Sequence, residues 1–100
     1  MGQIQLLIFG LLIVVIGILN IKGNIKTVHS YNRRKVKEED IPKYGKVVGI
    51  GTMIIGISLI VSYIITFWNE AIVEGIMITG FVIGFAFILY GQIKYNKGIF

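Results

Sequence analysis

Three long runs of apolar residues dominate this sequence of 100 residues and leave only short polar stretches between them. The runs extend from Ile4 to Ile21, from Val47 to Trp68 and from Ala71 to Gly91. As a helix, the first run is about 27 Å long, close to the thickness of a bilayer's hydrocarbon core. With 55% hydrophobic residues, the chain has more apolar surface than a soluble domain of this size can bury. The sequence therefore predicts an all-α integral membrane protein with three transmembrane helices.

The polar connections predict how these helices follow one another within a single membrane domain, residues 1–100. The turn between the second and third spans contains little more than Asn69 and Glu70, so we expect those helices to form a tight antiparallel hairpin. The connection between the first and second spans, residues 22–46, is longer. In that connection Pro42 suits the first turn of the second helix, because its missing N–H would have no helical partner there.

The distribution of basic residues predicts the orientation of the chain. Eight of its ten lysines and arginines lie between Lys22 and Lys46, and the other two are Lys94 and Lys97. Basic residues beside membrane spans stay on the cytoplasmic side. Three spans bring both clusters to that side, whereas two or four would separate them. We expect a multi-pass protein of a bacterial cell membrane, with the N-terminus outside and the C-terminus in the cytoplasm; the high isoleucine content suggests the bacterial origin.

Small residues recur along the predicted helices at spacings that keep them on one face. They are Gly45, Gly49, Thr52 and Gly56 in the second span and Gly80 and Gly84 in the third. Small side chains allow helix backbones to approach closely in lipid. Two interpretations are open. These faces could associate with another copy of the chain or a larger membrane protein, or they could pack the chain's own three spans together.

The loop between the first two spans combines basic and acidic residues. Its basic cluster consists of Arg33, Arg34, Lys35 and Lys37, followed by Glu38 and Glu39. Beside a membrane, such a cluster can bind anionic lipid headgroups at the inner leaflet, with about 1 kcal/mol for each basic residue, or it can dock a protein partner. Nucleic acid is disfavoured, because no aromatic platform accompanies the charges. A solvated turn with balanced charge is the alternative.

Few side chains could support catalysis or metal binding. The chain has no cysteine, and its single histidine, His29, has no Asp or Glu at ligand spacing. Ser30 follows His29 directly, an arrangement that does not generally form a Ser-His dyad. Glu74 is the one acid inside a predicted span and lies near its start, so proton-coupled transport through a carboxylate at membrane depth is disfavoured. We expect no enzymatic activity, no metal and no cofactor.

Part of the sequence, about residues 20 to 65, resembles a known family. The segments Asn24 to Arg33, Val36 to Asp40 and Tyr44 to Gly51 are similar to short bacterial membrane proteins of unknown function, mostly from Gram-positive species. Those proteins have one span, a polar loop with a Tyr-Asn core and a Lys-Glu-Glu run, and two further spans. The matching residues are Tyr31, Asn32, Lys37, Glu38, Glu39 and Gly49. His29, in the same loop motif, and Ser30 differ from the small Ala-Gly pair that many members have before the tyrosine. The resemblance implies three spans and assigns no activity.

Two classes of function fit these features. The first is a non-enzymatic accessory or regulatory subunit that associates through its glycine-rich helix faces. The alternative is an oligomeric channel or small transporter with a pore lined by hydroxyl groups. The candidate lining residues are Thr52, Ser58, Ser62, Tyr63, Thr66 and Thr79. More often, hydroxyls in membrane helices bond their own helix backbone or a neighbouring helix, which favours the subunit over the pore.

Overall fold

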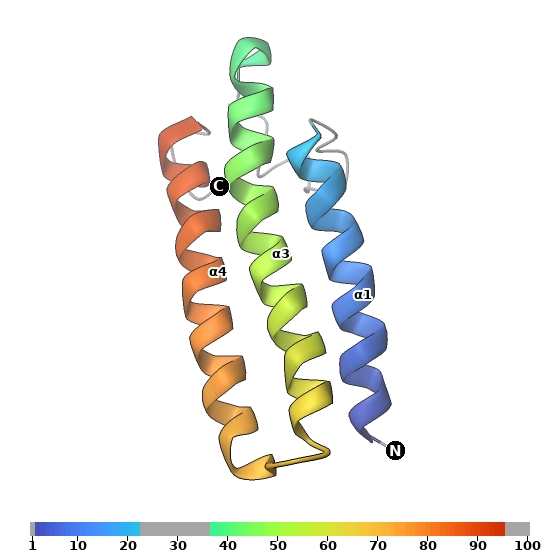
Figure 1. The fold of residues 1–100 in the computed structure, drawn as a ribbon. Coiled ribbons are helices and arrows are strands. Elements are labelled where there is room, and N and C mark those ends of the chain that lie inside the picture. Colours follow the sequence, from blue (N-terminus) through green and yellow to red (C-terminus); the bar gives the residue numbers. More distant parts are fainter. Residues whose placement is uncertain (1, 23–36, 96–100) are drawn as a thin grey trace.

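The structure, a computed structural model, describes residues 2–22 and 37–95 (Figure 1). In chain order its elements are α1 (Gly2–Ile21), the 3-10 turn η1 (Glu38–Asp40), α3 (Ile41–Ile65), the 3-10 turn η2 (Glu70–Ile72) and α4 (Val73–Tyr95). All three α-helices are long and apolar enough to cross a membrane. The predicted class, an all-α protein with three membrane-spanning helices, is confirmed.

α3 is the central helix, with α1 on one side and α4 on the other (Figure 1). In their most apolar stretches, 44% of the residues of α3 are buried, against 17% in α1 and 6% in α4. The outward surfaces of α1 and α4 are apolar, with Phe9, Leu12 and Val82 all more than half exposed. In water such surfaces would drive aggregation, whereas lipid can cover them.

α3 begins before the apolar run that marks its predicted span. The run starts at Val47, but the helix starts at Ile41 with Pro42 at its first positions, as expected. This difference arises because hydropathy locates the segment inside the hydrocarbon, whereas capping and proline determine where the helix itself begins. The extra turns carry the exposed side chains of Lys43 and Lys46.

The α3–α4 connection is the tight hairpin that the sequence predicts. α3 ends at Ile65, and Asn69 starts the next element by accepting a hydrogen bond from the Ala71 N–H at 3.0 Å. This side-chain cap satisfies a backbone donor that has no helical partner. Phe67 and Trp68 lie in the turn with most of their surface exposed. We call this the hairpin end of the molecule, and the opposite end, where α1 and α4 finish and α3 begins, the loop end.

The α1–α3 interface is a seam of reciprocal glycine contacts. A Cβ atom added to Gly10 would lie 2.9 Å from the carbonyl oxygen of Gly56, and one added to Gly56 would lie 2.8 Å from that of Gly10. Gly17 and Gly49 form the same kind of pair, at 2.8 and 2.6 Å. Cβ atoms do not approach backbone oxygens this closely, so only glycine fits. The two helices are therefore in direct backbone contact.

A second seam joins α3 to α4 on the opposite face of α3. A Cβ atom on Gly51 would lie within 2.5 Å of the Gly84 carbonyl oxygen, and one on Gly84 would lie 2.7 Å from that of Gly51. Nearby, Gly80 lies directly against the side chain of Ser58. Residues two positions apart in a helix are separated by about 200°, so the two seams occupy opposite sides of α3. The central helix thus has two smooth faces, one for each neighbour.

Candidate functional site

The small residues predicted for helix association all lie in the described helices, and four of them occupy the two seams. Gly49 and Gly56 face α1, whereas Gly80 and Gly84 face α3. Gly45 is buried near the start of α3. Thr52 is half-buried and donates its hydroxyl proton to the Val48 carbonyl oxygen at 2.9 Å. A partner could not reach the four seam glycines unless the chain's own helices separated.

Three buried polar side chains, one from each long helix, lie at the loop end. Asn20 of α1 and Tyr44 of α3 are 1% and 0% exposed, and Gln92 of α4 is 6% exposed. The Tyr44 hydroxyl donates a short hydrogen bond to Oε1 of Gln92. Val48 packs beside Tyr44, with Ile88 against them. This buried hydrogen bond between side chains links α3 to α4 at the loop end, opposite the hairpin turn.

The sequence alone does not predict this cluster, because Asn20 lies within the first apolar run and Tyr44 lies before the second, 24 positions away along the chain. The spacing of residues in α3 does indicate which helix Tyr44 faces. Tyr44 precedes Gly51 and Ser58 at intervals of seven, which places it on the side of α3 that faces α4. Gln92 directly follows Gly91, which packs against Val48.

All the lysines in the described residues are exposed at the loop end: Lys22, Lys37, Lys43, Lys46 and Lys94. Lys94 donates to the Tyr90 hydroxyl at 3.0 Å and lies over the Tyr90 and Tyr95 rings. Glu38 begins η1, and Glu39 is exposed beside it. The other loop residues predicted as sites lie outside the described residues: His29, Tyr31, Asn32, Arg33, Arg34 and Lys35.

The hydroxyl groups of α3 mostly bond their own helix. Ser58 donates to the Ile55 carbonyl oxygen at 2.7 Å, and Thr66 donates to that of Tyr63 at 2.5 Å. Ser62 is fully buried, and within residues 2–22 and 37–95 its hydroxyl has no hydrogen-bond partner. Thr79 is exposed on α4 and lines, together with Ser58, a groove of about 780 Å³ between α3 and α4. Neither Ser62 nor Thr66 lines this groove, so the hydroxyls do not all share one surface.

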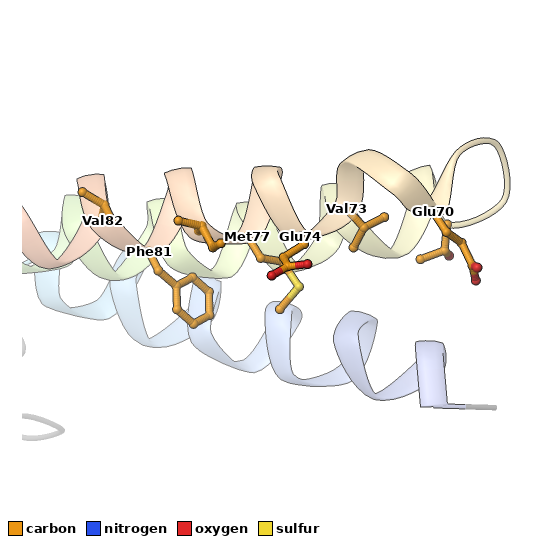
Figure 2. A pocket seen from close by; sticks show the side chains of 8 residues that line it. Glu70, Val73, Glu74, Met77, Phe81 and Val82 are labelled. Carbon is orange, nitrogen blue, oxygen red and sulfur yellow. The ribbon is translucent and has the colours of Figure 1, made fainter.

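A groove of about 600 Å³ opens at the hairpin end along α4 (Figure 2). Glu70 and Glu74 lie at its outer end, Met77 and Phe81 lie farther along, and Thr66 contributes from the end of α3. Figure 2 shows the side chains of Glu74, Met77 and Phe81 projecting from the same side of α4. The spacing of residues 70, 74, 77 and 81 explains this alignment, because it follows one face of a helix.

A further row of small residues follows η2 and α4, and three of them, Ala71, Gly75 and Thr79, line the groove that Ser58 and Val61 of α3 also line. Ala71, Gly75, Thr79 and Ala86 lie about half a helical turn from Gly84, and all four are exposed. A Cβ atom added to Gly75 would meet nothing within 4 Å, unlike one added to any glycine of the two seams. The chain's own packing therefore does not require glycine at this position.

The arrangement defines a multi-pass helical membrane protein built around one central helix. In the part of the chain that the structure describes, no three His, Cys, Asp or Glu side chains gather where a metal ion could bind. No protein family, no curated protein and no solved structure matches the chain. The resemblance to short bacterial membrane proteins therefore stays a prediction.

Proposed function

We propose that this chain is a non-enzymatic accessory or regulatory membrane subunit that associates laterally through the exposed face of α4 that carries Gly75. The observation that carries the proposal is the environment of Gly75: among the described residues, no atom lies within 4 Å of the place that a Cβ atom would take there. Glycine is about 1 kcal/mol less favourable than alanine inside a helix. In membrane helices, small residues usually allow close contact with another helix. At Gly75, no described helix of this chain makes such a contact. A helix from a second copy or a larger protein can pack there.

The glycines of the two seams also favour the face that carries Gly75 as the surface for association. Gly49, Gly56, Gly80 and Gly84 already hold the three helices of one chain together. Association through those residues would compete with the fold, whereas contact at Gly75, Thr79 and Ala86 would leave it intact. The alternative, an oligomeric channel lined by hydroxyls, has less support, since Ser58 and Thr66 bond their own backbone and Ser58 lies against Gly80.

Replacement of Gly75 by isoleucine tests lateral association. We expect the wild-type chain, extracted in a mild detergent, to have the mass of a complex, either a homo-oligomer or a defined complex with another protein. Gly75→Ile should release chains of single mass with unchanged helix content, because the added side chain separates the backbones. Light scattering after gel filtration measures the mass, and mass spectrometry identifies any second protein.

Leu12→Phe is the matched control, since Leu12 is exposed on α1 and the change also adds bulk. It should leave the complex unchanged. Single-chain mass for the wild type, or an identical complex for Gly75→Ile, would contradict the proposal. A symmetric homo-oligomer that conducts ions in liposomes would favour the channel instead.

In the proposed orientation the loop end is cytoplasmic and the hairpin end is outside. The exposed lysines at the loop end support this assignment, because basic residues resist translocation. They can also contact anionic headgroups of the inner leaflet. The outer end carries Glu70 and Glu74 instead.

The absence of cysteine from the sequence allows a direct test of orientation. We expect Phe67→Cys, in the exposed hairpin turn, to react with a membrane-impermeant maleimide on intact cells. Lys43→Cys, exposed at the loop end, should react only after the membrane is opened. Both reactions are read as a mass shift of the purified chain. The reverse pattern of labelling would overturn the proposed orientation.

A further inference from the structure

We propose that the groove at the hairpin end binds a single-chain amphiphilic cation, with the ammonium group at Glu70 and Glu74 and the alkyl chain along α4. The groove borders the face of α4 proposed for association, because Ile78 and Val82, three and seven positions after Gly75, line its edge. Its basis is the order of groups along one face of the helix: two carboxylates, then Met77, then Phe81. The groove therefore has a charged end followed by an apolar length. These two parts match a ligand that has a charged headgroup and an alkyl chain.

The carboxylates give the groove its charge complementarity. Neither Glu70 nor Glu74 has a basic neighbour in the sequence, since residues 47–93 and 1–21 contain no lysine or arginine. Both side chains are exposed at the end where the membrane interface would lie. Because no lysine or arginine of the spans neutralises them, a positively charged ligand group supplies the counter-charge.

The length of the groove selects an elongated ligand. Glu70 and Phe81 are eleven positions apart, which is about 16 Å along a helix. With Glu70 at the interface, Phe81 lies near the middle of a hydrocarbon core about 30 Å thick. An alkyl chain of dodecyl length can follow this path beside Val73, Met77 and Phe81. The volume of about 600 Å³ suits one such chain and lies within the usual range for small-molecule sites.

The same geometry disfavours a simple metal ion. Calcium takes six to eight oxygen ligands, whereas this groove offers two carboxylates and the Thr66 hydroxyl, which already donates to the Tyr63 carbonyl oxygen. The rest of the lining is apolar. Most of the binding free energy must therefore come from removing the alkyl chain from water, with the carboxylates selecting the charge of the headgroup.

Calorimetric titration of the full chain in phosphatidylcholine nanodiscs tests the site. The probe is dodecyltrimethylammonium chloride, and the heat of its partitioning into empty nanodiscs is subtracted. We expect a saturable component of one probe per chain. Tetramethylammonium, which has no tail, and dodecanol, which has no charge, should each bind at least tenfold more weakly. Calcium chloride alone should give no saturable heat.

Three variants connect the binding to the groove. The double variant Glu70→Gln with Glu74→Gln should raise the Kd for the probe at least tenfold, because it removes both charges and keeps the side-chain shape. Glu39→Gln is the matched control, since Glu39 is an exposed acid at the loop end; its Kd should equal that of the wild type. Phe81→Ala should weaken binding of the probe through loss of apolar contact, and circular dichroism checks that each variant keeps its helices.

Two results would overturn the proposal. Equal heats for the wild type and the Glu70→Gln, Glu74→Gln variant would mean that the probe only partitions into the bilayer. Equal affinities for tetramethylammonium and the dodecyl probe would mean that the carboxylates bind small cations without the groove. Neither result depends on whether Gly75 contacts a partner, so the two proposals fail separately.

Discussion

Gly49→Ala should lower the free energy of unfolding by about 2 kcal/mol, within the usual cost of overpacking a close contact. The physical reason is the position of the added Cβ atom, 2.6 Å from the carbonyl oxygen of Gly17 and 2.8 Å from the backbone nitrogen of Ile21. Neither backbone atom can move alone, so α1 as a whole must shift away from α3. Titration with sodium dodecyl sulfate in mixed micelles, followed by the fluorescence of Trp68, measures the change.

The same substitution on the open face is the matched control. Gly75→Ala adds its Cβ atom where no heavy atom lies within 4 Å, so its effect should stay within about 0.5 kcal/mol, as for other surface changes. The two variants differ only in what the new methyl group meets. Equal effects from Gly49→Ala and Gly75→Ala would show that the α1–α3 seam is looser than the structure indicates.

Loss of the Tyr44 hydroxyl should also lower the free energy of unfolding. Tyr44→Phe removes the donor to Gln92 Oε1 in a site where both residues are almost fully buried. Removing one partner of a buried hydrogen bond costs about 1–3 kcal/mol, because the remaining group is left without that bond. The same unfolding titration measures the loss, and Tyr63→Phe, on a half-buried tyrosine of the same helix, should change the free energy by less than about 0.5 kcal/mol.

A double-mutant cycle measures the interaction energy between Tyr44 and Gln92. Gln92→Met removes the acceptor and keeps a side chain of similar length. We expect Tyr44→Phe and Gln92→Met together to cost less than the sum of the single changes, by about 1 kcal/mol, since residues in direct contact are not additive. Additive effects would mean that the bond does not couple α3 to α4.

The three helices and their hairpin could be predicted from the sequence because each rests on local properties. The length of each span follows from its uninterrupted apolar residues. The short connection at Asn69 and Glu70 requires the helices on either side of it to be neighbours. The start of α3 was predictable from Pro42 and not from hydropathy. The apolar run begins at Val47, whereas the helix begins with Pro42 near its first position, as expected.

The use of the glycines could not be predicted from their spacing alone. Periodicity places Gly49 and Gly56 on one face of the second span, but it does not state which helix that face meets. Whether a small face packs inside the chain or against a partner depends on three-dimensional pairing. The same limit applies to the groove: the sequence places Glu74 near the start of a span, but it does not show the groove that Glu74 lines together with Met77 and Phe81.

The glycine seam between α1 and α3 also determines the register of the two helices. Gly10 and Gly17 are seven residues apart, as are Gly49 and Gly56. A slip of one residue would rotate a bulky side chain by about 100° into the backbone of the neighbour. A slip of seven would bring one glycine of each pair back into contact but would displace α1 by about 10 Å, a third of the hydrocarbon thickness. Glycine spacing thus reduces the possible alignments to a few that are widely separated, and the thickness of the membrane selects one of them.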